Sequence, residues 1–234
     1  MRTAWSPRRV ATGLVLAGWA ALFWFVILTG RTPLYLSSRT GWVAPVGAVL
    51  LTAAAGGRLL SSRARRPAPL GRDTAWRLGF LALPVVALLV LPPTTLGSYA
   101  ASRRSLAGAG FGPSAGQVGT GEVTLADVAA AVWSPEAAAA LTERAGSRVA
   151  FVGIVVRRGG MPADEFLLTR FIVTCCVADA LSVQVRVVGA PPGGFEQDQW
   201  VRVAGTIYPL GREVILQASE ITPVPRPARP YLQV

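Results

Sequence analysis

The residues of this 234-residue sequence best suited to chemistry are two adjacent cysteines, Cys175 and Cys176, with Asp179 three positions beyond them. Thiolates bind soft metal ions such as Cu(I) and Zn(II), and a carboxylate could add a ligand. Alternatively, both cysteines are packing residues at a strand end, since free cysteine is commonly buried. A disulfide between these neighbours would require a strained local backbone. Neighbouring side chains of an extended strand point to opposite faces. We therefore expect one cysteine in the core and the other facing outward.

Other catalytic constellations are excluded by residue type. The sequence contains no histidine, which rules out Ser-His-Asp triads, Cys-His dyads and histidine metal centres. Two cysteines are too few for a disulfide scaffold or a closed four-cysteine zinc site. No pair of carboxylates has a spacing typical of acid–base catalysis. We expect a protein that is not an enzyme and that requires no cofactor. A soft metal ion is the cofactor that its residues could hold.

Charge is distributed unevenly along the chain. Residues 1–100 contain eleven arginines and one acid, whereas residues 101–234 contain twelve arginines and eleven acids. The strongly basic character therefore belongs to the first half. A nucleic-acid-binding domain is expected to carry its own basic face. The near-neutral second half lacks one, so we expect no nucleic-acid partner.

Three stretches without charged residues lie in the first half, at residues 10–30, 40–57 and 78–102. A bilayer core about 30 Å thick needs roughly 20 helical residues, so we expect a transmembrane region over residues 1–102, with the third span at 78–99. No ionisable residue lies inside any stretch. This absence argues against an ion pathway in this chain alone, and favours an anchor or one subunit of a transporter in contact with membrane lipid.

The side of the membrane follows from the arginines. The first stretch follows a basic start, as in a signal peptide, but it is longer than the about 7–15 apolar residues typical of one. We expect it to be retained. Arginines gather before residue 10 and between residues 58 and 77, and the positive-inside rule places these segments in the cytoplasm. Three spans make a multi-pass protein of the cell membrane with an extracytoplasmic C-terminal half; if residues 40–57 do not cross, that half lies inside.

The second half begins with a glycine-rich linker at residues 103–122, followed by a soluble domain at 123–234. Thr124 with Asp127, and Ser134 before Pro135, are start signals for two short helices. Five strands are then expected, at residues 149–157, 165–174, 181–188, 199–208 and 213–224. The overall fold class is an α-helical membrane region plus a small all-β or α+β domain with a five-stranded, OB-like barrel.

Phe166 and Phe171 are the aromatic residues that could stack on bases in such a barrel, near Arg170. An odd spacing places them on opposite faces of a regular strand, so at most one could stack outward. Arg170 and Asp179 flank the cysteines and could form a supporting ion pair across the strand ending.

A longer pattern surrounds the cysteines. Residues 169–180 read Thr-Arg-Phe-Ile-Val-Thr-Cys-Cys-Val-Ala-Asp-Ala, and Asp198-Gln-Trp200-Val-Arg-Val and Gly205-Thr-Ile follow. With the proline-spaced ending of residues 223–231, this pattern resembles the YcgQ-like family of bacterial two-component permease subunits, which have a C-terminal domain of unknown function. The resemblance covers residues 148–234 by motif and the membrane half by layout. It implies a multi-span permease as partner, and a shared design that includes the motif residues Arg170, Phe171, Asp179, Asp198, Trp200 and Gly205.

Two functions of different classes remain. The first is a membrane-anchored accessory subunit of a permease, whose barrel presents a surface for a ligand or for the partner. The second is a membrane-tethered thiol protein that binds metal or undergoes redox chemistry through Cys175 and Cys176.

Overall fold

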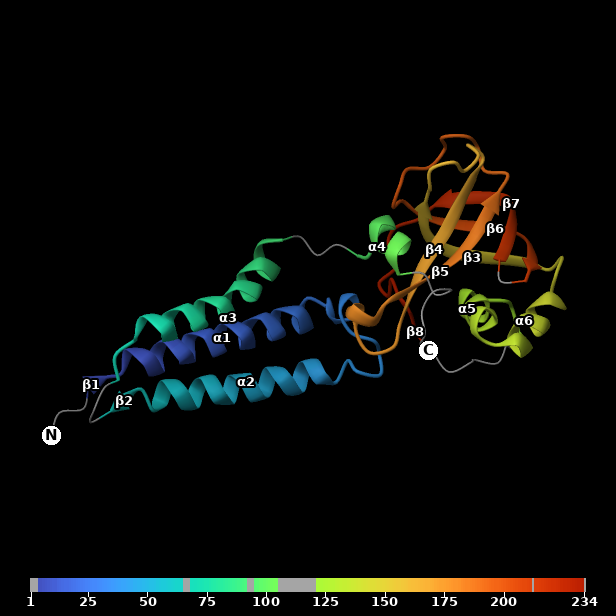
Figure 1. Ribbon diagram of the computed structural model, residues 1–234. Coiled ribbons are helices and arrows are strands. Elements are labelled where there is room, and N and C mark those ends of the chain that lie inside the picture. Colours follow the sequence, from blue (N-terminus) through green and yellow to red (C-terminus); the bar gives the residue numbers. More distant parts are fainter. Residues whose placement is uncertain (1–3, 65–67, 92–94, 105–120, 212, 234) are drawn as a thin grey trace. The chain divides into compact units, whose positions relative to one another are not determined.

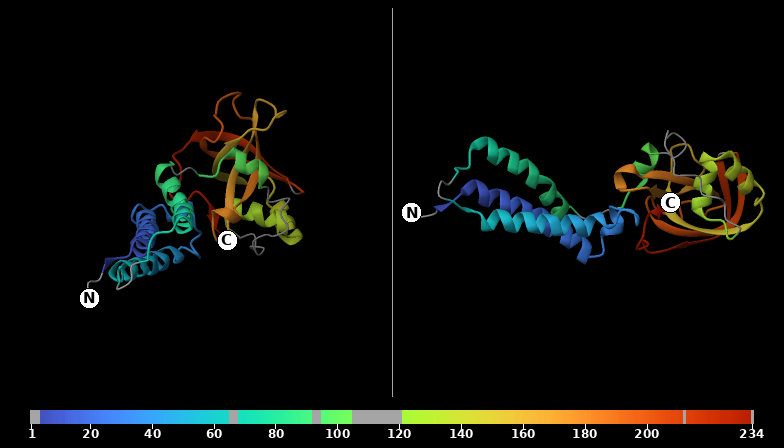
Figure 2. Two further views of the ribbon diagram at one scale, coloured as in Figure 1. Left: turned by 60° about the vertical axis from the view of Figure 1, so that its left-hand side comes forward. Right: turned by 90° about the horizontal axis from the view of Figure 1, so that it is seen from below.

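The computed structural model describes residues 4–64, 68–91, 95–104, 121–211 and 213–233 (Figure 1). The chain divides into two compact units, Met1–Thr94 and Thr95–Val234. The first unit is helical and the second contains the barrel, as Figure 2 shows from two further directions. Residues 105–120 of the expected linker lie outside the described residues.

Three long helices dominate the first unit: α1 (Pro7–Leu28), α2 (Val43–Leu60) and α3 (Arg72–Val90). Each is long and apolar enough to cross a membrane, as the charge-free stretches predict. Few residues of their most apolar windows are buried within the chain, 17%, 17% and 6% respectively. Apolar side chains cover these helices on the outside, which is typical of helices in contact with lipid. A two-stranded sheet, β1 (Ala4–Trp5) with β2 (Arg63–Ala64), joins the start of α1 to the end of α2.

Helix α1 packs against both α2 and α3. A Cβ atom at Gly47 of α2 would lie 2.8 Å from the ring of Phe23 in α1, so a larger residue there would have to displace that ring. Trp24 donates a hydrogen bond from Nε1 to Thr52 Oγ1 at 3.1 Å, and Trp19 donates to the carbonyl of Leu81 in α3 at 2.9 Å. Polar groups within the apolar helices are thereby satisfied by neighbouring helices, as a bilayer requires.

The third charge-free stretch is divided between the two units. α3 ends at Val90, and Leu91, which precedes Pro92 in the sequence, has an extended backbone with ψ 132°. Proline disfavours a helical conformation in the residue before it, which accounts for the helix end. A short helix, α4 (Ser98–Arg103), follows in the second unit. The third span was expected at residues 78–99, but the helix that contains its start ends at Val90.

Two helices precede the barrel, α5 (Leu125–Trp133) and α6 (Pro135–Thr142). Thr124 and Asp127 form the expected capping box, and the Ser134 hydroxyl accepts the Ala137 N–H ahead of Pro135. Both helices lie at one end of the barrel (Figure 1) and bury their apolar residues against its core.

The barrel contains the five expected strands, whose ends differ from prediction by at most two residues: β3 (Arg148–Val156), β4 (Glu165–Val173), β5 (Leu181–Val188), β6 (Trp200–Leu210) and β7 (Glu213–Pro223). The sheet closes in the order β3-β6-β7-β5-β4, with β4 pairing back to β3. Only β5 and β7 among these five run parallel. A sixth strand that the sequence did not predict, β8 (Leu232–Gln233), pairs in parallel with β4.

Two glycines allow the barrel to close. A Cβ atom at Gly153 would lie 2.7 Å from the Thr169 carbonyl oxygen, at the point where β3 leaves β6 and approaches β4. A Cβ atom at Gly205 would overlap the carbonyl of Gln217, beside an irregularity in the β6–β7 register. Glycine is typical of such corners, where two backbones approach closely. This contact explains why Gly205 belongs to the motif.

Candidate functional site

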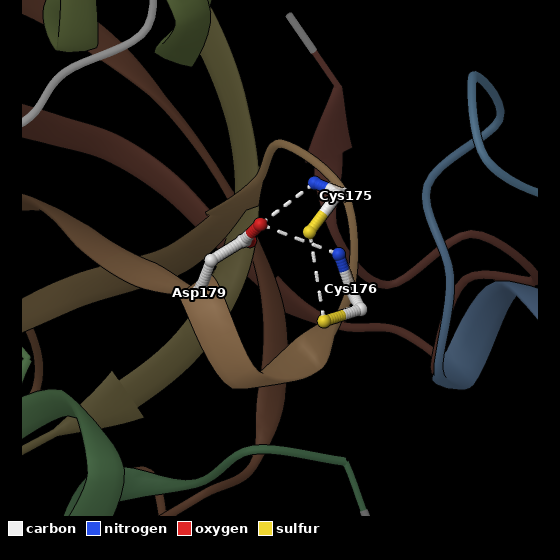
Figure 3. Close-up of side chains that lie close together, drawn as sticks. All are labelled: Cys175, Cys176 and Asp179. Atoms are coloured by element: carbon white, nitrogen blue, oxygen red, sulfur yellow. Dashed lines mark hydrogen bonds between the residues drawn. The ribbon is translucent and has the colours of Figure 1, made fainter.

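The cysteine pair lies in the turn between β4 and β5, beyond the last strand residue, Val173 (Figure 3). Cys175 is exposed and Cys176 is half-buried, and neither is in a disulfide bond. The prediction that one of them enters the barrel core is wrong. It assumed that the strand continues through the pair, whereas the backbone turns at Thr174 and forms a 3-10 helix, Val177–Asp179.

Asp179 is responsible for this turn. Its carboxylate accepts hydrogen bonds from three successive backbone N–H groups: Thr174 at 3.0 Å, Cys175 at 2.7 Å and Cys176 at 3.3 Å. Figure 3 shows the last two. The two Sγ atoms lie 3.6 Å apart on the same side of the turn. Ligand atoms of Cys175, Cys176 and Asp179 all lie within 4.8 Å of one another, so the three residues could hold a metal ion.

The turn also changes the acidity of its side chains. Hydrogen bonding to the Asp179 carboxylate, followed by hydrogen bonding to Cys176, raises the pKa of Cys175 to about 12. Partial burial acts to raise the pKa of Asp179, but the hydrogen bonds from the Cys175 thiol and the three backbone N–H groups outweigh it and lower that pKa. At neutral pH the turn therefore contains a carboxylate beside a protonated thiol.

Arg170 does not form the suggested ion pair with Asp179. Its guanidinium donates instead to the carbonyls of Arg229 at 2.8 Å, Pro230 at 3.1 Å and Val152 at 3.4 Å. It also lies 5.8 Å from the centre of the Trp200 ring, within the range of a cation–π interaction. Burial lowers the pKa of Arg170. The motif arginine thus fastens the C-terminal tail to β4.

Asp198 fastens a second segment. This residue has a positive φ of 65°, which aspartate tolerates better than most residues. Its carboxylate accepts hydrogen bonds from the backbone N–H and the hydroxyl of Ser98, the first residue of α4. Asp198 therefore joins the β5–β6 loop to the start of the helix that follows the last long apolar helix in sequence.

Both segments cover a second hydrophobic cluster, on the outer face of β3 and β4. The cluster buries Phe171, Ile154 and Leu167 together with Ala101 of α4 and Tyr231 of the tail, and Trp200 packs at its edge. Phe166 belongs to the main core inside the barrel. The two phenylalanines thus point to opposite faces as predicted, and both are buried, with 0% and 2% exposure. Neither is available to stack on a base.

Helix α4 is bound to β5 by polar side chains that the sequence did not single out. The Ser182 hydroxyl donates to the carbonyl of Ala101 or Arg104, at 3.1 and 3.0 Å, and Gln184 Nε2 donates to Ala101 at 3.3 Å. The Arg104 guanidinium in turn donates to the carbonyls of Val177 and Ala178, in the turn that contains Asp179. Gln184 alternates with the buried valines of β5 and so lies on its outer face, but alternation carries no information about what covers that face.

A groove of about 480 Å³ lies beside this contact, on the outer face of β4 and β5 and under the β3–β4 loop. Its polar lining includes Arg158, Glu165, Ser182, Gln184, Arg186 and Glu213. Arg186 is paired with Glu213 at 2.7 Å and Glu165 at 3.6 Å, whereas the exposed Arg158 donates to Gln184 Oε1 at 2.7 Å. The second and third strands and the adjoining loop are where OB-type barrels commonly bind ligands.

Comparison with known proteins gives one family match. Residues 119–233 match the family described as the DUF1980 C-terminal domain. No curated protein matches the chain. The matched segment contains α5, α6, all five barrel strands, the cysteine turn and the groove. The second unit of this protein therefore contains a DUF1980 C-terminal domain.

Proposed function

We propose that the protein is a membrane-anchored accessory subunit of a two-component permease, in which the barrel presents the groove on β4 and β5 to the partner. Three helices that could span a membrane provide the anchor, and the resemblance of the cysteine motif to YcgQ-like subunits supports a permease as partner.

The observation that carries the proposal is that the groove and the docking site of α4 share side chains. Ser182 and Gln184 line the groove and also bind the carbonyl of Ala101 in α4. Gln184 additionally accepts a hydrogen bond from Arg158 of the β3–β4 loop. A partner segment in the groove would therefore contact the residues that hold α4, the helix that follows α3 in the sequence. Such a contact suits a subunit that works within a membrane complex.

The motif residues support the same role. Arg170, Asp198 and Trp200 hold the tail and α4 against the barrel rather than facing an open catalytic cleft. A domain fastened at both ends suits a part that must keep a fixed binding surface. This arrangement favours binding over catalysis.

The proposal is tested by purification of the tagged, full-length protein from membranes of its native host. We expect a multi-span membrane protein to copurify, and deletion of that protein's gene to lower the level of this chain. Purification without any membrane protein, together with an unchanged level in the deletion strain, would contradict the proposal. A variant with Arg158 and Gln184 changed to alanine, expressed at the same level, tests the groove itself and should lose the copurifying protein.

A further inference from the structure

The turn after β4 combines three donor side chains that no other function of the protein explains. Cys175 and Cys176 take no part in either hydrophobic cluster, and both are accessible to some degree. Packing alone therefore does not account for two adjacent thiols at this position. The Asp179 carboxylate shapes the turn by accepting backbone N–H groups. This role requires no thiol, so it does not explain the two cysteines.

The spacing of the sulfur atoms matches a metal site. A tetrahedral zinc ion with Zn–S bonds of about 2.3 Å holds two sulfur ligands about 3.8 Å apart. The Sγ atoms of Cys175 and Cys176 are 3.6 Å apart before any ion is bound (Figure 3). The thiols thus need little rearrangement to become a bidentate pair.

Asp179 supplies a third ligand that is already oriented. A carboxylate has about four lone-pair positions, and three are used by the N–H groups of residues 174–176. The Cys175 thiol occupies the fourth, which an ion takes over when that thiol gives up its proton. The ligand atoms of the three residues already lie within 4.8 Å of one another. The N–H groups hold this carboxylate in place, as supporting hydrogen bonds do around metal ligands.

We propose that Cys175, Cys176 and Asp179 form an open binding site for a thiophilic divalent ion of the zinc type. Binding replaces the two thiol protons, which are released to solvent, with two metal–sulfur bonds, and no atom changes oxidation state. Three protein ligands leave a fourth position for water or for a ligand from another molecule. Such a site exchanges its ion more readily than a closed four-cysteine site. This inference does not depend on the accessory-subunit role.

The test is a zinc titration of the full-length, reduced protein in detergent, in competition with a chromophoric chelator. We expect one ion per chain and at least a tenfold weaker affinity in each of the Cys175→Ser and Cys176→Ser variants. Cobalt should give a sulfur-to-metal charge-transfer absorption that both variants weaken. Since the protein has two cysteines in all, no other thiol contributes to this signal.

Matched variants distinguish binding from folding. Thr174→Ser, next to the pair, should bind zinc as the unmodified chain does. Asp179→Asn should weaken zinc binding, and Asp164→Asn, the carboxylate control, should leave it unchanged. Thermal unfolding without metal should be the same for the cysteine variants and the unmodified chain, because neither thiol lies in a core. Equal zinc binding by the unmodified chain and the double Cys175→Ser, Cys176→Ser variant would overturn the proposal.

Discussion

Gln184 donates a hydrogen bond from its side-chain amide to the carbonyl oxygen of Ala101, 3.3 Å away, and accepts one from Arg158 through its amide oxygen. One side chain of β5 thus joins the groove to helix α4. With Ser182 it forms the polar part of the contact between the barrel and the segment that continues to the apolar helices.

Replacing Ser182 by alanine should loosen this contact. The Ser182 side chain is buried, and its removal takes away one donor from the carbonyls of Ala101 and Arg104, which keep Gln184 Nε2 and the Ser182 N–H as their other donors. An ordinary hydrogen bond contributes about 0.5–1.5 kcal/mol, and hydrogen exchange in α4 should accelerate correspondingly. Ser219→Ala, which removes an exposed hydroxyl bonded to Ala204, is the control and should leave α4 unchanged.

Asp198→Ala should release the start of α4. The carboxylate that caps Ser98 is lost, at a cost of about 1 kcal/mol, and a residue with positive φ becomes alanine, which adds strain. Limited proteolysis between residues 95 and 104 should become faster. Asp198→Asn keeps an acceptor and tolerates this φ. If Asp198→Asn were cleaved as fast as Asp198→Ala, capping of α4 would be refuted as the cause.

Arg170→Met should free the C-terminal tail. The methionine keeps much of the apolar stem but makes none of the three hydrogen bonds to carbonyls of Val152, Arg229 and Pro230. A hydrogen bond to a charged group contributes about 1.5–3 kcal/mol. Since three are removed, we expect the free energy of unfolding to fall by at least about 2 kcal/mol. The exposed Arg202→Met is the matched control. Equal stability of the two variants would show that the tail contact contributes nothing.

Alkylation of Cys175 should depend on Asp179. The pKa of Cys175, about 12, lies above its ordinary value of 9.0, so between these pH values the folded protein keeps a proton that the unfolded chain loses. Any stability from this proton is present below pH 9 and is lost as pH rises through 12. In a Cys176→Ser background, Asp179→Asn should accelerate alkylation by iodoacetamide at pH 8 by about tenfold for each pKa unit removed. A rate unaffected by the change would contradict the role of the carboxylate.

Gly205→Ala should be strongly destabilising. The added methyl group would overlap the backbone of Gln217, which cannot move without opening the β6–β7 pairing. We expect a loss of more than about 2 kcal/mol, measured by chemical denaturation. Gly159→Ala, where a Cβ meets nothing within 4 Å, is the control and should unfold at nearly the same denaturant concentration.

The strands and helix starts were predictable because their signals are local. Alternating valines in β5, and the Thr124–Asp127 capping box, depend on residues a few positions apart. The direction of the cysteines was not predictable in this way, since Asp179 bends the chain back on three N–H groups. Strand periodicity does not hold through such a turn.

The long-range contacts of the motif could not be predicted either. Arg170 binds carbonyls of Arg229 and Pro230, about 60 positions along the chain, and Asp198 binds Ser98, 100 positions away. Backbone carbonyls are present at every residue, so no sequence pattern marks the ones that an arginine binds. Arg170 and Asp198 were identified from the sequence, but their tasks of holding the tail and α4 could be recognised only in the fold.

Crosslinking from the groove tests the central claim most directly. A photo-crosslinking residue would be placed at Arg158, which lines the groove, and separately at Arg202, an exposed arginine of β6 outside it. In native membranes the account predicts an adduct with a multi-span membrane protein from position 158 and none from position 202. The absence of such an adduct from position 158, or the same adduct from both positions, would contradict the account.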